Sequence, residues 1–209
     1  MELLRELFEK NAKWASRTEA EDPGFFGRLT AQQAPQFFWI GCSDSRVPAT
    51  QITGLMPGEI FVHRNVANLV AHQDLSCHAA LQYAVDVLKV RNVLVVGHHG
   101  CGGVRAAMQD QELPGPIGEW LRPVRALYQE RQGFFSNWNN HQERWDKLCE
   151  LNVVAQVDAL CEIPIIHSAW ERGQELAVHG LIYDVRDGRL QDLNVTATSK
   201  RECADISRS

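Results

Sequence analysis

The order of apolar and polar positions along the chain predicts short buried strands that alternate with helices. The segment PQFFWIGC predicts a strand that ends at Cys42, EIFVHRN one that ends near Arg64, and NVLVVGHHGCGG a third that ends at His98. The third run is rich in β-branched residues and does not alternate, which is typical of a parallel strand covered on both faces. We therefore expect an α/β fold with a central, mostly parallel β-sheet flanked by α-helices.

Helical spacing of apolar residues occurs before, between and after these strands. It covers Leu3 to Trp14, resumes after the plausible helix cap Asp74, and extends over most of the range from Ile117 to Cys161, with an interruption at GFFSNWNN. Further along, ELAVHGLIYDV and RLQDLNV predict a pair of strands joined by a turn at Asp187-Gly188. The chain thus combines a parallel sheet with one antiparallel addition.

The length and composition of the chain favour one domain with an appended arm. Its 209 residues, of which 44% are hydrophobic, are enough for one sizeable core. We expect a single domain over residues 1–209, with residues 1–34 as an N-terminal helical arm. The first helix has no sequence neighbour long enough to cover its apolar face. We therefore expect this arm to pack on a second copy of the chain, which would make the protein a homo-oligomer.

Charge and cysteine content indicate which partners and which cellular compartment to expect. A net charge of -5 without any basic run gives no reason to expect binding to nucleic acid or to an anionic membrane surface. Charged residues interrupt the first segment, unlike a signal peptide, and no apolar run approaches transmembrane length. Six cysteines in such a chain suggest thiols that are free, buried or bound to metal in a reducing compartment. We expect a cytoplasmic protein that acts on a small molecule.

Three potential metal ligands follow two of the predicted strands. Cys42 ends one strand, while His98 and Cys101 form an H-x2-C pair where a neighbouring strand passes into a helix. Because the carboxyl ends of parallel strands meet at one edge of the sheet, where such folds bind ligands, these side chains can converge. Two thiolates and an imidazole suit Zn²⁺. The sequence therefore predicts a zinc site at this edge.

Other motifs in the sequence point to no competing chemistry. Arg105 stands where a G-x-G-x-x-G fingerprint needs its last glycine, and there is no C-x-x-C motif of the thioredoxin type. Cys77 and Cys149 lie on apolar helix faces, which predicts a packing role for both. For Cys161 and Cys203 the pattern indicates nothing beyond packing.

The motifs CSDSR, GEIFVHRNVAN and GHHGCGG, in this order, resemble those of the β-class carbonic anhydrases, and SAWERGQELAVHGLIYDV and VTATS extend the resemblance over nearly the whole chain. In that family two cysteines and a histidine hold one zinc ion, and they match Cys42, His98 and Cys101. The family's aspartate and arginine match Asp44 and Arg46. The resemblance implies reversible hydration of carbon dioxide to bicarbonate and a proton by zinc-bound hydroxide, in dimers that often pair into tetramers.

Two readings of the acid in the first motif stay open at this point. An ionised Asp44 could accept a hydrogen bond from the zinc-bound hydroxide, while Arg46 keeps the carboxylate away from the metal. Alternatively, Asp44 could itself fill the fourth position of a structural or sensing zinc site without catalysis. Hydrolysis of another small linear molecule, such as carbon disulfide, on the same scaffold is a further alternative.

A regulatory pocket is also implied by the resemblance. One bacterial subgroup of the β class has a tryptophan, an arginine and a tyrosine that line a second, non-catalytic bicarbonate pocket, and these match Trp39, Arg64 and Tyr183. An indole N–H, a guanidinium and a phenol can all donate to an oxyanion. The resemblance thus implies an enzyme that low pH and bicarbonate switch off.

Overall fold

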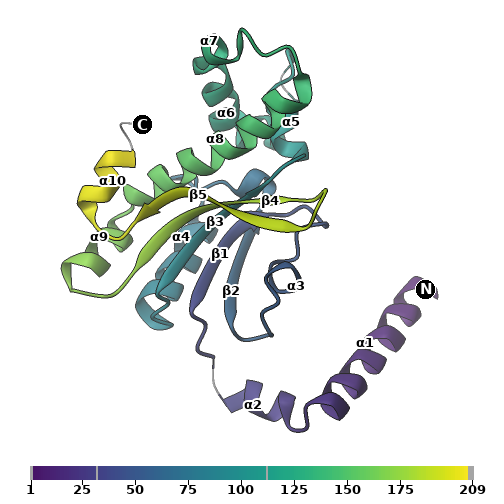
Figure 1. The fold of residues 1–209 in the computed structure, drawn as a ribbon. Helices are drawn as coiled ribbons and strands as arrows, with labels where there is room; N and C mark the ends of the chain where they lie inside the picture. The colour runs from purple at the N-terminus through teal and green to yellow at the C-terminus, as the bar shows by residue number, and fades with distance from the viewer. Residues whose placement is uncertain (1, 32, 112, 207–209) are drawn as a thin grey trace. The chain divides into compact units, whose positions relative to one another are not determined.

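The computed structural model describes residues 2–31, 33–111 and 113–206, and its contacts divide the chain into two units, residues 1–34 and 35–209. The larger unit is an α/β domain and the smaller one contains two helices (Figure 1).

A five-stranded sheet in the order β2-β1-β3-β4-β5 forms the centre of the larger unit. The first four strands in this order are parallel, whereas β5 runs antiparallel to β4 after the expected turn, in which Gly188 has a φ of 72°. The predicted mostly parallel sheet is thus confirmed. The strands are β1 (Phe37–Cys42), β2 (Ile60–Asn65), β3 (Asn92–His98), β4 (Ala177–Asp184) and β5 (Arg189–Ala197).

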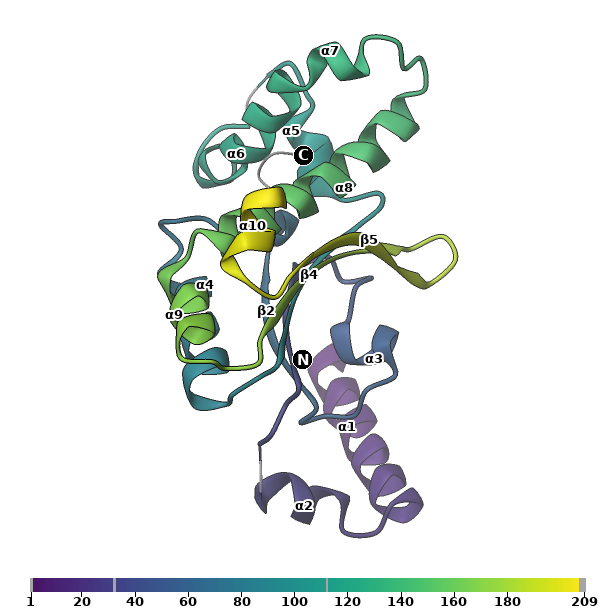
Figure 2. The ribbon, with the colours of Figure 1, turned by 60° about the vertical axis from the view of Figure 1, so that its left-hand side comes forward.

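Most of the helices of this unit cover one face of the sheet. Figure 2 shows α4, α8, α9 and α10 on that side and the short helix α3 on the other. The expected cap of α4 is present, since the carboxylate of Asp74 accepts hydrogen bonds from the backbone N–H groups of Ser76 and Cys77. The helices are α3 (Ala49–Thr53), α4 (Leu75–Gln82), α5 (Gly102–Ala107), α6 (Pro116–Glu130), α7 (Gln132–Phe135), α8 (His141–Cys161), α9 (Pro164–Glu171) and α10 (Lys200–Ile206).

The core has two parts because successive residues of β1 point to opposite faces of the sheet. Phe38 and Ile40 pack into the large cluster beneath α4 and α8, whereas Trp39 packs into a smaller cluster on the side of α3. Each fully buried apolar side chain of this kind contributes about 1.5–3 kcal/mol to stability. Strand β1 is therefore anchored from both faces, which steadies Cys42 at its end.

A glycine lets β3 approach α8 closely. A Cβ atom at Gly97 would lie only 2.5 Å from Cγ2 of Val153, so any side chain here would push the helix away from the strand. Residue 97 directly precedes His98, the last residue of β3. The close approach therefore sets the distance between α8 and the end of the strand that carries the histidine.

The smaller unit consists of α1 (Glu2–Glu21) and α2 (Phe25–Ala31). Helix α1 is longer than the predicted segment from Leu3 to Trp14, and none of its residues is buried. Its apolar face is largely exposed: the exposed fraction is 82% for Leu3 and 64% for Phe8. Trp14 makes an edge-to-face contact with Phe26, which links the two helices.

The expectation that all six cysteines are thiols or metal ligands is wrong. Cys161, the last residue of α8, forms a disulfide with Cys203 in α10. The two positions are 42 residues apart, and they meet because the β4–β5 pair returns the chain so that α10 packs on α8. The other four cysteines are free and buried. Burial raises the pKa of Cys77 and of Cys149 to about 12, which fits their expected packing role.

No helix within the described ranges has both the length and the apolar character needed to cross a membrane.

Candidate metal centre

Three potential metal ligands meet at the carboxyl edge of the parallel strands. Cys42 is the last residue of β1, His98 is the last residue of β3, and Cys101 immediately precedes α5. Their ligand atoms all lie within 4.8 Å of one another, and the three side chains are buried. The fold thus brings together the residues that the sequence placed at strand ends.

The two sulfur atoms of the cysteines lie within hydrogen-bond distance of each other. Sγ of Cys42 lies 3.8 Å from Sγ of Cys101. A hydrogen bond from the Cys101 thiol lowers the pKa of Cys42 to about 4, whereas the same bond, together with burial, raises the pKa of Cys101. Only one of the two thiols therefore ionises readily. A divalent cation would stabilise both thiolates, because it adds the positive charge that the buried pair lacks.

The histidine presents an unpaired nitrogen to the same point. Nδ1 of His98 lies 3.0 Å from the backbone carbonyl oxygen of His99, which can only accept, so Nδ1 carries the proton. Nε2 is then a lone-pair donor, and it is buried without a hydrogen-bond partner among the residues that the structure describes. An orphaned imidazole nitrogen beside two sulfurs fits a zinc ion, which takes exactly such nitrogen and sulfur ligands.

His99 points away from this centre, as expected from its place next to His98. Its ring nitrogens face Asp184 at 3.3 Å and Glu150 at 3.2 Å. The hydrogen bond to Glu150 is the main cause of the raised pKa of His99. The ring of His99 thus interacts with carboxylates, and its backbone carbonyl orients His98.

A carboxylate lies next to the three ligands and is held by an arginine. Both oxygens of Asp44 pair with Arg46, at 3.0 Å from Nε to Oδ1 and 2.7 Å from Nη2 to Oδ2. These bonds hold the pKa of the Asp44 carboxyl well below its usual range, so it is ionised at neutral pH. Oδ2 also lies 3.7 Å from Nε2 of His98. Arg46 in turn contacts the carbonyl oxygen of Gly100.

The family model described as carbonic anhydrase matches residues 37–190, a range that contains all of these groups. The chain belongs to the β-carbonic anhydrase family.

Individual relatives of this β-class enzyme agree with the family match. A carbonic anhydrase of Emericella nidulans is 41% identical over 189 residues, which cover 90% of this chain and 82% of that protein. One of two tetrameric β-carbonic anhydrases from Sordaria macrospora superposes with a TM-score of 0.90 at 36% identity, covering 94% of this chain and all of that one. The Coccomyxa β-carbonic anhydrase in complex with acetazolamide superposes with a TM-score of 0.91 at 38% identity, covering 97% of this chain and 91% of that one.

The structure gives separate surroundings for the three residues matched to a bicarbonate pocket. Trp39 and Tyr183 belong to one buried cluster on the side of α3, and Nε1 of Trp39 has no partner within the part of the chain that the structure describes. Arg64 donates from Nε to the carbonyl oxygen of Cys42 and from Nη2 to that of Asp44. Arg64 thus contacts the backbone of the metal centre itself.

A second group of potential ligands is already explained by local structure. His63, Asp74 and Cys77 also have ligand atoms within 4.8 Å of one another. Asp74 caps α4, and Nε2 of His63 lies beside the amide nitrogen of Asn65 at 3.4 Å. Unlike Nε2 of His98, Nε2 of His63 has a hydrogen-bond partner and also lies 3.7 Å from Oδ2 of Asp74. This group therefore serves the helix cap.

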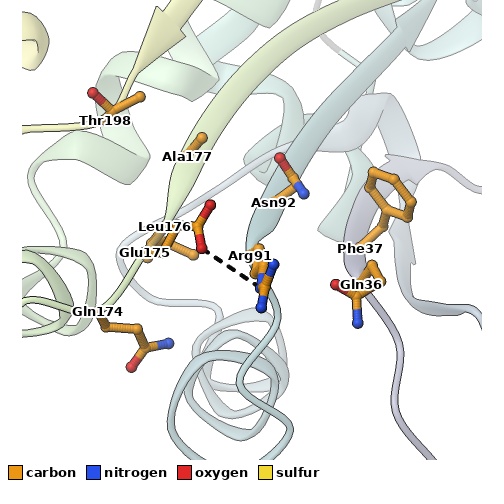
Figure 3. A pocket seen from close by; sticks show the side chains of 9 residues that line it. All are labelled: Gln36, Phe37, Arg91, Asn92, Gln174, Glu175, Leu176, Ala177 and Thr198. Atoms are coloured by element: carbon orange, nitrogen blue, oxygen red, sulfur yellow. Dashed lines mark ion pairs between the residues drawn. The ribbon is translucent and has the colours of Figure 1, made fainter.

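A pocket of about 590 Å³ lies at the opposite end of the strands (Figure 3). Its charged pair, Arg91 and Glu175, is largely exposed, with Nε and Oε2 3.7 Å apart. Since Cys42 and His98 end their strands, this pocket is remote from the metal centre and offers no comparable chemistry. It is lined by Gln36, Phe37, Arg91, Asn92, Gln174, Glu175, Leu176, Ala177 and Thr198.

Helix α8 supplies contacts to the centre that sequence reasoning missed. Nε1 of Trp145 donates to the carbonyl oxygen of Cys101 at 2.9 Å. Asn152 and Gln156 are buried on the face of this helix that otherwise carries apolar residues. Two amides four residues apart on an apolar helix face are visible in the sequence, but the backbone groups that they contact lie more than 80 positions away.

Proposed function

We propose that this chain catalyses the reversible hydration of carbon dioxide with one Zn²⁺ per chain, held by Cys42, His98 and Cys101. The observation that carries the proposal is the buried trio itself, in which the two sulfurs are 3.8 Å apart and Nε2 of His98 lacks a hydrogen-bond partner among the described residues. A zinc ion bound there would supply a Lewis acid that activates water for attack on carbon dioxide. The products are bicarbonate and a proton.

In this proposal Asp44 orients the reacting water and Arg46 orients Asp44. An ionised carboxylate accepts hydrogen bonds but cannot donate, so it selects one direction for the proton of the water. The bidentate pair with Arg46 keeps the carboxylate ionised and fixes its plane. The contact between Arg46 and Gly100 ties this pair to the loop that precedes Cys101.

Two rival functions are less well supported. A structural or sensing zinc site would use Asp44 as the fourth ligand, whereas both oxygens of Asp44 here face Arg46. Hydrolysis of another small linear molecule would use the same ligands, but the 41% identity to a carbonic anhydrase favours carbon dioxide as the substrate.

The exposed face of α1 supports a homo-oligomer, at least a dimer or a dimer of dimers, in which residues 1–34 pack on a second copy. Leu3, Leu4, Leu7 and Phe8 are each more than half exposed. A contiguous apolar face of this kind is typical of an interaction surface. The tetrameric relatives of Sordaria macrospora support an assembly of this type.

The cytoplasm is the compartment we propose for this enzyme. Two of its cysteines are needed as metal ligands, and a reducing compartment keeps such thiols available. The Cys161–Cys203 disulfide is compatible with that setting because both residues are buried, which shields the bond from attacking thiols.

Bicarbonate and low pH are proposed to switch the enzyme off through Trp39, Arg64 and Tyr183. Arg64 donates to the backbone carbonyl of Asp44, so an anion that draws this guanidinium away would loosen the segment that carries Asp44. Asp44 could then leave Arg46 and occupy the metal. Low pH acts in the same direction, because a carboxylate competes for a metal better against neutral water than against hydroxide. The anion acts only through its differential affinity for the two arrangements.

The zinc assignment predicts one zinc ion per chain in the purified protein. Replacing a ligand thiol, as in Cys42→Ser or Cys101→Ser, should remove the metal and carbon dioxide hydration together, because the hydroxyl is a poor ligand for zinc. Elemental analysis and stopped-flow hydration measure the two effects. Cys77→Ser is the matched control, since this buried thiol lies outside the centre, and it should keep its zinc. Full zinc content in Cys42→Ser would refute the assignment.

The role of Asp44 predicts that Asp44→Asn retains zinc but loses most of its hydration activity. An amide has neither the carboxylate's charge nor its pairing with Arg46, so the rate should fall at least about tenfold. The measurement is the hydration rate per bound zinc. A rate close to that of the parent would remove Asp44 from the mechanism.

The proposed arm contact predicts at least a dimer at micromolar concentration by light scattering. Leu7→Glu should shift the protein toward monomer, because it places a charge in the middle of the apolar face of α1. Arg5→Glu is the control, since residue 5 lies on the opposite side of the helix by its spacing. A monomeric parent would contradict the proposed assembly.

The proposed switch predicts little activity below neutral pH, a cooperative rise at alkaline pH, and inhibition by bicarbonate. In Tyr183→Phe the loss of one donor should weaken that inhibition roughly fivefold. Hydration rates measured against pH, with and without added bicarbonate, test this, and Tyr128→Phe in α6 is the matched control. A single-proton profile with full activity at mildly acidic pH would exclude the switch and leave the zinc chemistry intact.

A further inference from the structure

The turn that follows β2 has an unfavourable backbone conformation. Ala67 and Asn68 have φ values of 66° and 50°, which place two consecutive non-glycine residues in the left-handed region. Both residues are buried. A Cβ atom makes this conformation costly, so it persists only where the surrounding structure holds it. The contacts of residues 65–70, called the 65–70 turn below, therefore need an explanation.

Part of this support is local. The amide side chain of Asn65 spans the turn, since Oδ1 accepts from the N–H of Leu69 and Nδ2 donates to its carbonyl oxygen, both at 2.7 Å. Nε1 of Trp120 in α6 donates to the carbonyl oxygen of Val66 at 2.8 Å. These bonds close the turn on either side of Ala67, but they do not reach Ala67 or Val70.

Two buried amides of α8 complete the support. Nδ2 of Asn152 donates to the carbonyl oxygen of Ala67 at 2.9 Å, and Oε1 of Gln156 accepts from the N–H of Val70 at 2.8 Å. Nε2 of Gln156 also donates to Oδ1 of Asn152 at 3.1 Å, so the two side chains form one hydrogen-bonded unit. A buried amide is costly unless it is paired, and both of these are paired through the 65–70 turn.

The 65–70 turn packs against both segments that carry sulfur ligands of the metal centre. The turn contacts β1, and Ala67 belongs to the same buried apolar cluster as Cys42 and Cys101. A Cβ atom at Gly103 would lie 2.8 Å from Cγ1 of Val66 and 3.2 Å from Cβ of Ala67, so the turn also packs against the first turn of α5, directly after Cys101. A displaced turn would therefore disturb Cys42 and the start of α5 together.

We propose that Asn152 and Gln156 are positioning residues of the metal centre, which hold Ala67 in its left-handed conformation and keep the 65–70 turn packed against the segments that carry Cys42 and Cys101. Neither side chain touches the ligand atoms, and both act through the 65–70 turn. The inference rests on the proposed zinc function. It differs from a purely structural role for the two amides because it predicts a selective effect on metal binding.

The test compares zinc affinity in three variants of the full-length protein. Asn152→Leu keeps the branched shape of the side chain and removes both hydrogen bonds of Asn152, while Gln156→Glu keeps the acceptor for Val70 and removes only the donor to Asn152. Val157→Ala is the control, because Val157 is fully buried on the same helix and belongs to the apolar core. Zinc dissociation constants come from competition with a chelator, and hydrogen exchange by mass spectrometry follows peptides that cover residues 65–70.

We expect Asn152→Leu to weaken zinc binding about tenfold or more, as is typical for residues that support a metal ligand. Gln156→Glu should weaken it less, and in both variants the 65–70 turn should exchange its amide hydrogens faster. Val157→Ala should keep zinc affinity within about twofold of the parent, because it leaves the ligand-supporting hydrogen bonds in place.

Parental zinc affinity and slow exchange in Asn152→Leu would overturn the inference. Where Asn152→Leu does not fold, unchanged zinc affinity in Gln156→Glu overturns it instead. If the parent protein fails to bind zinc, the metal centre itself is refuted. If the parent binds zinc and both amide variants bind it equally tightly, only the positioning role is refuted.

Discussion

The parallel pairing of β1 with β3 determines the rest of the site. The two strands are in register from Phe37 with Asn92 to Gly41 with Val96, so their carboxyl ends lie at one edge, where Cys42 and His98 project. Antiparallel strands would place the same two residues at opposite ends of the sheet. Cys101 needs only to follow β3 by three residues to join them. The proposed metal site therefore depends on the parallel pairing of these strands.

The electrostatics at this edge are set by two buried thiols and a carboxylate that lie close together. The hydrogen bond between two thiols 3.8 Å apart lowers the pKa of Cys42 and raises that of Cys101, while Asp44 stays ionised because Arg46 is beside it. With zinc present, two thiolates would balance the charge of the dication, which makes a nearby carboxylate important for controlling the water. A metal ion would therefore stabilise the two thiolates, whereas the carboxylate of Asp44 is stabilised by the protein itself.

Helix α8 connects the core to the site. Its apolar residues pack on the sheet, and Gly97 allows the close approach, while Trp145, Asn152 and Gln156 make polar contacts with segments around the ligands. Interiors are close-packed and transmit displacement, so a helix that is fixed on the sheet can also fix loops that it contacts. The same helix thus stabilises the fold and limits the movement of the ligand-bearing segments.

The sequence by itself determined the parallel sheet, the antiparallel pair at its edge, the cap at Asp74 and the meeting of Cys42 with His98 and Cys101. Each of these follows from local periodicity or from a general rule about where parallel strands end. Only the tertiary structure decided that Cys161 pairs with Cys203 and that Asn152 supports Ala67. These contacts join positions 42 and 85 residues apart. Local patterns encode which face of an element is buried, but they do not encode which distant side chain it meets.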